Sequence, residues 1–299
     1  MRKSAEQDCG EEPDRESLQI KTVGRTFMEK EFKEGAEKVI RACGEIIRNA
    51  DRSELGIVSK EGHANFVTRY DALVQKELQQ GLQKLRPEAA FLGEEGDSSD
   101  YPDEEEVFIV DPIDGTTNFM VGLDQSCISV ALARKREVVY AAIYNPFTDA
   151  YYEAEKGGGA YRNHEPIRVS GEPLEHGVAF IGTAPYYEEL TDISFAKARE
   201  YLKRCIDIRR SGSAALDLCS VAEGRAVIFF EAKLQPWDYA AGSLIVEEAG
   251  GGVMDWNGRP LEIGAVSSVV AYGRGVMGIW EQTDAGQTVY FAKVGEATH

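Results

Sequence analysis

Two aspartates that are three residues apart follow an apolar stretch in the segment Phe108-Ile-Val-Asp-Pro-Ile-Asp-Gly-Thr. Asp111 and Asp114 end an expected strand, and the Gly-Thr-Thr that follows opens an expected helix. Carboxylates bind hard cations, while backbone N–H groups at a helix start, here those of Gly115 and Thr116, can receive phosphate oxygens. The segment therefore predicts a place where a metal ion and an anion meet.

A second acidic pair, Glu94 and Glu95, directly follows the apolar residues 91–93. A charged side chain at the end of an apolar strand is costly unless it binds a cation, so we expect a function for this pair. The acidic residues 97–106 that follow are more typical of a solvated loop.

A third segment, Gln-Pro-Trp-Asp-Tyr-Ala-Ala-Gly, contains Asp238. Taken alone, an aspartate before an Ala-rich helix indicates an N-cap and nothing more. Its small residues favour a helix start that packs closely against a neighbour.

Carboxylates are the only abundant candidates for chemistry in this chain. The four histidines show no metal-ligand spacing, and the five cysteines are scattered without a Cys-x-x-Cys pair, which argues against a zinc site and against a Ser-His-Asp triad. Oxygen ligands alone favour Mg²⁺ over zinc.

The composition and the apolar pattern argue against two classes of partner, nucleic acids and membranes. The 299 residues include 33 Lys and Arg against 51 Asp and Glu, a formal charge of −18, which disfavours binding to nucleic-acid phosphates. No apolar run is long enough to span a membrane, and the polar N-terminus lacks the apolar part of a signal peptide. We expect a cytoplasmic protein without a membrane partner.

The hydrophobic pattern predicts a flexible tail over 1–28 and one catalytic domain over 29–299. Its first half, 29–176, is expected to hold helices over 32–50 and 71–85 and then a mostly antiparallel sheet. The strands of that sheet are expected at 89–93, 107–110, 129–134, 138–144, 150–153 and 159–162. The second half, 177–299, alternates, with strands at 178–181, 206–209, 227–231, 252–255 and 266–271 and helices at 187–204, 214–222 and 238–248. The fold class is α/β, in the wider sense that includes α+β.

Together the three segments resemble the inositol monophosphatase family of magnesium-dependent, lithium-sensitive phosphatases. That family carries Gly-Glu-Glu, Asp-Pro-Ile/Leu-Asp-Gly-Thr and Trp-Asp-x-Ala-Ala-Gly in the same order, and here these motifs stand at Gly93, Asp111 and Trp237. Further matches are Val-Thr-x-x-Asp with an upstream lysine, Gly-Ser-Ala-Ala, and a glutamate seven residues before the last aspartate. The residues that carry these matches are Lys60, Asp71, Gly212, Ser213, Ala214 and Glu231. Phe108 departs from the family, where a Trp is common.

The resemblance implies a layered αβαβα sandwich of the inositol monophosphatase and fructose-1,6-bisphosphatase type. It also implies two or three Mg²⁺ ions, with Mn²⁺ as a possible substitute. Glu94, Asp111 and the carbonyl of Ile113 would bind one ion, and Asp111, Asp114 and Asp238 a second. Glu95 and Asp71 would support the ligands or hold a third ion. Lys60 either counters the phosphate or lies on a mobile loop.

For catalysis the resemblance implies that Thr116, paired with Glu94, orients a water molecule, with Asp111 as the shared ligand. Substrate contacts are expected from the residues that surround these acids. They are Gly115, Thr116, Gly212, Ser213, Ala214, Glu231 and Asp238, and Thr183 is a further candidate.

The expected reaction is hydrolysis of a small phosphate monoester by an activated water. Inositol monophosphate is the first candidate because Glu231 can accept hydrogen bonds from a polyol. Fructose-1,6-bisphosphate, 3′-phosphoadenosine 5′-phosphate, NADP and histidinol phosphate are alternatives. From another class, a non-catalytic metal- or phosphate-binding protein with the same fold is possible. The family also implies a homodimer and inhibition by Li⁺.

Overall fold

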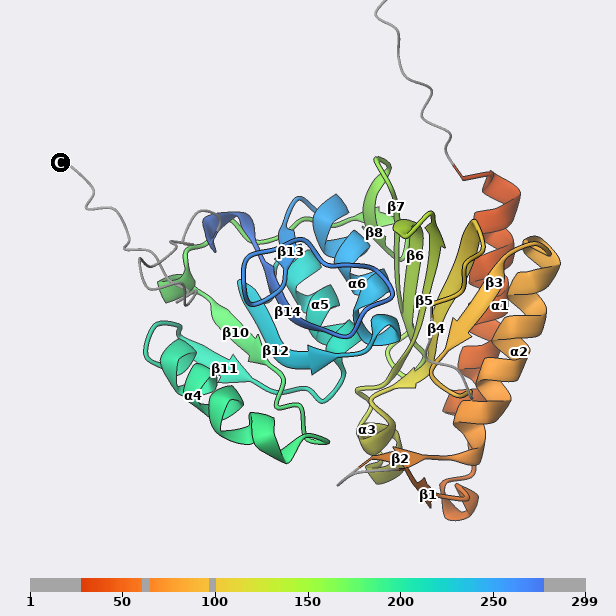
Figure 1. Ribbon diagram of the computed structural model, residues 1–299, viewed down its shortest axis with the longest axis horizontal. Coiled ribbons are helices and arrows are strands. Elements are labelled where there is room, and N and C mark those ends of the chain that lie inside the picture. The colour runs from red at the N-terminus through yellow and green to blue at the C-terminus, as the bar shows by residue number, and fades with distance from the viewer. Residues whose placement is uncertain (1–27, 61–64, 97–100, 277–299) are drawn as a thin grey trace, which may run out of the picture.

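The computed structural model describes residues 28–60, 65–96 and 101–276, and two β-sheets make its framework (Figure 1). The larger sheet has seven strands that follow the chain order, β3 to β9. Strands β3 and β4 are parallel and the other neighbours are antiparallel. The bounds are β3 Ala90–Gly93, β4 Glu106–Asp114, β5 Cys127–Arg134, β6 Glu137–Asn145, β7 Ala150–Glu155, β8 Gly159–Arg162 and β9 Glu165–Pro166.

The second sheet has five strands in the order β11-β10-β12-β14-β13. Its first three strands run parallel, whereas β14 is antiparallel to both β12 and β13. The bounds are β10 Val178–Ile181, β11 Asp207–Arg209, β12 Ile228–Leu234, β13 Gly252–Met254 and β14 Ser267–Tyr272. A separate hairpin-like pair, β1 Val58–Ser59 and β2 Phe66–Val67, lies beside the site.

Helices fill the space between the sheets and cover their outer faces. Figure 1 shows α5 and α6 between the two sheets, α1 and α2 outside the larger sheet, and α4 outside the smaller one. The bounds are α1 Lys30–Arg48, α2 Arg69–Leu85, α3 Thr116–Val121, α4 Thr191–Leu202, α5 Ala214–Ala222 and α6 Pro236–Glu248. This order of layers confirms the predicted αβαβα sandwich.

Three apolar clusters are buried between the layers, and one of them joins α5 and α6 to both sheets. In α1 the buried residues Phe32, Ala36, Ile40, Cys43 and Ile47 recur at steps of three and four, which places them on the face toward the sheet. Strand β4 is covered on both faces, so eight of its nine residues are buried without alternation. A strand in this position holds the residues at its end firmly in place.

Several element boundaries differ from the predicted ones. Helix α6 begins at Pro236 rather than at Asp238, and a 3-10 turn over Glu188–Leu190 precedes α4 where one continuous helix was predicted. Met28, placed in the predicted tail, is buried, and its backbone N–H donates to Glu155. The rest of the predicted tail, 1–27, lies outside the described residues.

No helix in the described part of the chain is both long and apolar enough to cross a membrane. Of the described cysteines, Cys43, Cys127 and Cys219 are buried free thiols and Cys205 is a half-buried one.

Candidate active site

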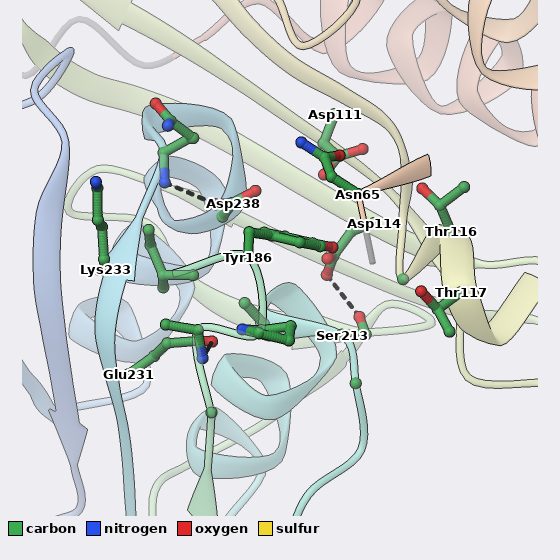
Figure 2. A pocket seen from close by; sticks show the side chains of 18 of the residues that line it. Asn65, Asp111, Asp114, Thr116, Thr117, Tyr186, Ser213, Glu231, Lys233 and Asp238 are labelled. Atoms are coloured by element: carbon green, nitrogen blue, oxygen red, sulfur yellow. Dashed lines mark hydrogen bonds between the residues drawn. The ribbon is translucent and has the colours of Figure 1, made fainter. Parts of the chain in front are cut away.

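A cavity of about 360 Å³ opens where the larger sheet meets α5, α6 and the smaller sheet (Figure 2). Both halves of the chain contribute to its wall. The predicted site residues that line it are Lys60, Glu94, Asp111, Ile113, Asp114, Gly115, Thr116, Gly212, Ser213, Ala214, Glu231 and Asp238. The fold thus brings together residues that are far apart in the sequence.

A β-bulge at the end of β4 presents Asp111 and Asp114 to this cavity. Asp111 pairs with Ser129 and Asp114 with Cys127, so β4 has one residue more than β5 over this stretch. Pro112, which cannot donate to a strand ladder, lies within the bulge. The Asp111 carboxylate accepts the Ile113 N–H at 2.9 Å, which fixes the turn.

Asp114 is held by groups from the other half of the chain. Its Oδ2 atom accepts hydrogen bonds from the Ser213 hydroxyl at 2.5 Å and from the Ala215 N–H at 2.7 Å. Burial raises the pKa of Asp114, and these two hydrogen bonds oppose the rise. Ser213 also caps α5, because its hydroxyl accepts the Leu216 N–H.

Glu94 directly follows β3, and its N–H donates to the Val110 carbonyl of β4. Its carboxylate lies 3.0 Å from the Lys60 Nζ atom, which also contacts Glu95. Burial raises the pKa of Glu94 to about 7, although Lys60 opposes the shift. Lys60 therefore forms an ion pair with each of the two glutamates.

Asp238 is the third residue of α6, where its carboxylate accepts the Gln235 N–H at 2.7 Å. It forms a capping box with Gln235 instead of the N-cap that the sequence suggested, because the helix begins at Pro236. Burial raises the pKa of Asp238 well above its ordinary value, and the charges of Asp114 and Glu94 raise it further.

The acids repel one another across the cavity. The pKa of Asp111 lies well above its ordinary value because of burial and then because of the charges of Glu94, Asp114 and Asp238. Four carboxylates around one cavity, with Lys60 as the cation at Glu94, form a donor set that suits hard divalent ions. Within the described ranges, however, no three His, Cys, Asp or Glu side chains are already arranged to hold a metal ion.

The Thr116 hydroxyl contacts Asp71 rather than the predicted Glu94. It lies 3.3 Å from Asp71 Oδ1 and 3.1 Å from the Ile113 carbonyl. Asp71 is fully buried at the start of α2, where its other oxygen accepts the Thr68 N–H and hydroxyl at 2.8 and 2.6 Å. The capping box of α2 thus holds the Asp71 carboxylate within hydrogen-bond distance of the Thr116 hydroxyl.

Glu231 lies on β12 at the opposite wall of the cavity and is 9% exposed. Its Oε1 atom accepts the Ala184 N–H at 2.9 Å. Burial raises the pKa of Glu231 to about 7, against this hydrogen bond and the nearby charge of Arg210. The carboxylate that the sequence assigned to substrate hydroxyls therefore also holds the loop after β10.

That loop carries pocket residues that the sequence analysis missed. From this loop Tyr186 and Tyr187 line the cavity, and Arg210 and Lys233 line it from other segments. Gly182 and Ala184 also line the cavity, whereas Thr183, the suggested residue between them, does not. The available signal was an aromatic pair after a proline, in a loop that directly follows a strand. Tyrosines in such a loop usually serve packing, so the pattern gave no reason to choose them.

Comparison with known proteins agrees with this geometry. The model of the inositol monophosphatase family matches residues 28–287. An inositol-1-monophosphatase from Rhizobium meliloti is 42% identical over 212 residues, which cover 70% of this chain and 80% of that protein. The Nus factor SuhB of Vibrio cholerae is 33% identical over 240 residues, covering 80% and 90%.

The fold has the same relatives. The structure of the Thermotoga maritima inositol monophosphatase superposes with a TM-score of 0.71 and 30% identity, covering 82% of this chain and 93% of that one. The sequence match, the order of the layers and the acid-lined cavity all lead to one assignment: the chain belongs to the inositol monophosphatase family and is a phosphoric monoester hydrolase.

Proposed function

We propose that the protein hydrolyses a small phosphate monoester with the help of Mg²⁺, and that inositol monophosphate is its first candidate substrate. The observation that carries the proposal is the convergence of Glu94, Asp111, Asp114 and Asp238 on one cavity whose far wall holds Glu231. The Rhizobium meliloti relative is named for the same substrate. Small phosphorylated molecules are the partners in this scheme.

Glu94, Asp111, the Ile113 carbonyl, Asp114 and Asp238 are the groups that would hold Mg²⁺, and Lys60 would leave Glu94 as the ions bind. Glu95 lies beside Lys60 and supports this exchange. Bound Mg²⁺ would stabilise negative charge on the phosphoryl oxygens and on the departing alkoxide. Mn²⁺, which also prefers oxygen ligands, could replace it.

The chain positions the attacking water through Thr116 and Asp71. The Thr116 hydroxyl can donate to Asp71 and at the same time accept a hydrogen bond from a water molecule. That direction of hydrogen bonding leaves a lone pair of the water free to attack phosphorus. Glu94 would accept a proton of the water.

In this proposal the substrate lies between the side of the cavity that carries the metal-binding acids and the opposite wall, which carries Glu231. Backbone N–H groups of the Gly115–Thr116 turn would bind the phosphate, and Gly212–Ala214 would form the facing wall. The second oxygen of Glu231 would accept a hydrogen bond from the alcohol, because its Oε1 atom already holds Ala184.

Phosphate release with Mg²⁺ from a panel of esters tests the proposal. The panel contains inositol 1-phosphate, fructose-1,6-bisphosphate, 3′-phosphoadenosine 5′-phosphate, NADP and histidinol phosphate. We expect the fastest release from inositol 1-phosphate and loss of release in the Asp114→Asn variant. Faster release from another ester would replace the substrate, and release by Asp114→Asn at the wild-type rate would contradict the metal assignment.

A second candidate is a metal- or phosphate-binding protein without turnover. The contact between Lys60 and Glu94 favours it, because the ion pair occupies the proposed base while the lysine at the cavity wall can still attract phosphate. Binding of Mg²⁺ and inorganic phosphate in a titration calorimeter, without phosphate release from any ester of the panel, would establish this candidate.

A further inference from the structure

We propose that Tyr186 contacts the substrate and that its hydroxyl donates a hydrogen bond to the phosphate group of the ester. The inference rests on the proposed phosphatase function and adds a residue to its site. Tyr186 lines the cavity from the loop that follows β10. Figure 2 shows its ring extending across the cavity, with the hydroxyl on the side of Asp114.

The Tyr186 hydroxyl lies among the acids rather than on the side of the alcohol. Figure 2 shows it directed toward Asp114, and Glu94, Asp111, Asp114 and Asp238 line the same cavity as Tyr186. These are the side chains around which a phosphate would be bound. A donor placed there meets phosphate oxygens, whereas the hydroxyls of the leaving alcohol lie toward Glu231.

The hydroxyl is free to take such a partner. Figure 2 marks no hydrogen bond between the Tyr186 hydroxyl and the other residues drawn, and Tyr186 is 43% exposed. A phenol is neutral near pH 7 and keeps its proton. Beside a bound phosphate it would donate to a phosphate oxygen, and a hydrogen bond to a charged acceptor is a strong one.

The loop around Tyr186 is held at both ends, so the donor is pre-organised. On one side the buried Ala184 has φ +43° and donates its N–H to Glu231 at 2.9 Å. An alanine in the left-handed region is strained and persists only where its surroundings fix it. On the other side the Lys233 Nζ atom lies 3.6 Å from the centre of the Tyr187 ring.

The packing of Tyr186 involves its ring and can be kept when the hydroxyl is removed. The ring of Tyr186 contacts the ring of Tyr187 edge to face, with 6.5 Å between their centres, and a phenylalanine preserves this contact. Tyr186→Phe therefore removes the donor and keeps the packing. A suitable control is Tyr161→Phe, which removes a hydroxyl that donates to the Gly158 carbonyl, outside the cavity.

The test measures binding of inorganic phosphate to the Mg²⁺-loaded protein by calorimetry, together with KM and kcat for inositol 1-phosphate. We expect Tyr186→Phe to weaken phosphate binding and raise KM by about tenfold each, the size of one hydrogen bond to a charged group. Tyr161→Phe should match the wild type. KM should rise more than kcat falls, a split that a merely structural defect would not produce.

Three results would overturn the inference. The first is unchanged phosphate binding in Tyr186→Phe. The second is tighter phosphate binding in Tyr186→Phe, which would show that the phenol obstructs the site. The third is a wild-type protein that binds no phosphate. Failure of the proposed function is a separate result. If the wild type binds phosphate but releases none from any ester, the proposed function fails, while the comparison of phosphate binding still decides the role of Tyr186.

Discussion

The Ser213 hydroxyl donates to Asp114 Oδ2 at 2.5 Å, so a helix from the second half of the chain fixes a carboxylate from the first half. The two residues are separated by 99 positions in the sequence. The same Asp114 oxygen accepts the Ala215 N–H at 2.7 Å, from the first turn of α5. The position of this acid therefore depends on how α5 packs between the two sheets.

Replacing Ser213 should weaken both the fold and the activity. Ser213→Ala removes a donor to a buried carboxylate and the N-cap of α5, which should lower the free energy of unfolding by about 1–3 kcal/mol. Ser213→Thr keeps the hydroxyl and should stay close to the wild type. Urea unfolding and phosphate release measure the two effects, and equal values for Ser213→Ala and the wild type would refute the coupling.

Thr116 and Asp71 should act as one unit in catalysis. Thr116→Val removes the hydroxyl and should lower kcat on the order of 10²-fold, the size typical of lost proton-transfer assistance. Thr116→Ser should restore most of the rate. If the unit exists, the double variant Thr116→Val with Asp71→Asn should be hardly slower than the slower single variant. Independent, multiplying losses in kcat would argue against it.

Glu231 should make the stability of the metal-free protein depend on pH. Its pKa rises from 4.5 to about 7 on folding because of burial, so the folded state binds the proton more tightly than the unfolded state. The resulting stability is fully present below pH 4.5 and is lost as the pH rises through about 7. The rise in pKa corresponds to about 3 kcal/mol.

Comparison with Glu231→Gln isolates this contribution from those of the other acids. Urea unfolding in the presence of a chelator at several pH values between 4.5 and 8 measures it. The wild type should lose stability relative to Glu231→Gln as the pH rises. A constant difference between the two proteins over this range would be inconsistent with a buried carboxyl at position 231.

Most of this fold could be predicted because the hydrophobic periodicity of each segment agrees with the layer in which that segment packs. Helix α5 begins and ends at the predicted residues, and strands β3 to β8 of the larger sheet lie within a few residues of their predicted ends, whereas β9 was not predicted. The pattern failed where polar side chains set the boundary. The capping box between Gln235 and Asp238 moved the start of α6, and a 3-10 turn shortened α4.

Glu94, Asp111 and Asp114 were found because carboxylates after apolar strands are unusual, whereas Asp238 was assigned to the site only through the family resemblance. Their partners were not, because contacts such as that between Thr116 and Asp71 depend on how α2 lies against β4. The aromatic pair after a proline was too weak a signal to place Tyr186 in the site, since its position depends on the hydrogen bond between Ala184 and Glu231, which comes from tertiary packing. The spacing of residues along the chain does not predict such tertiary contacts.

Gly115 should not tolerate a side chain. Its φ is +87°, and a Cβ would lie 2.9 Å from the Gln125 carbonyl and 3.2 Å from the Gly212 carbonyl. Gly115→Ala should therefore lower the unfolding free energy by about 1–3 kcal/mol and disturb the turn between Asp114 and Thr116. Gly171→Ala, where no atom lies within 4 Å of the added carbon, is the matched control. Similar thermal midpoints for the two variants would count against this reading.

The central claim is that the buried carboxylates form a cation site, and a Mg²⁺ titration of thermal unfolding tests it most directly. Asp111 is 2% exposed, and three other acids raise its pKa. In chelator Asp111→Asn should therefore unfold at the same temperature as the wild type or a higher one, because repulsion is relieved. Mg²⁺ should raise the midpoint of the wild type progressively and leave that of Asp111→Asn nearly unchanged. Equal Mg²⁺-induced shifts in the two proteins, or none in the wild type, would contradict the account.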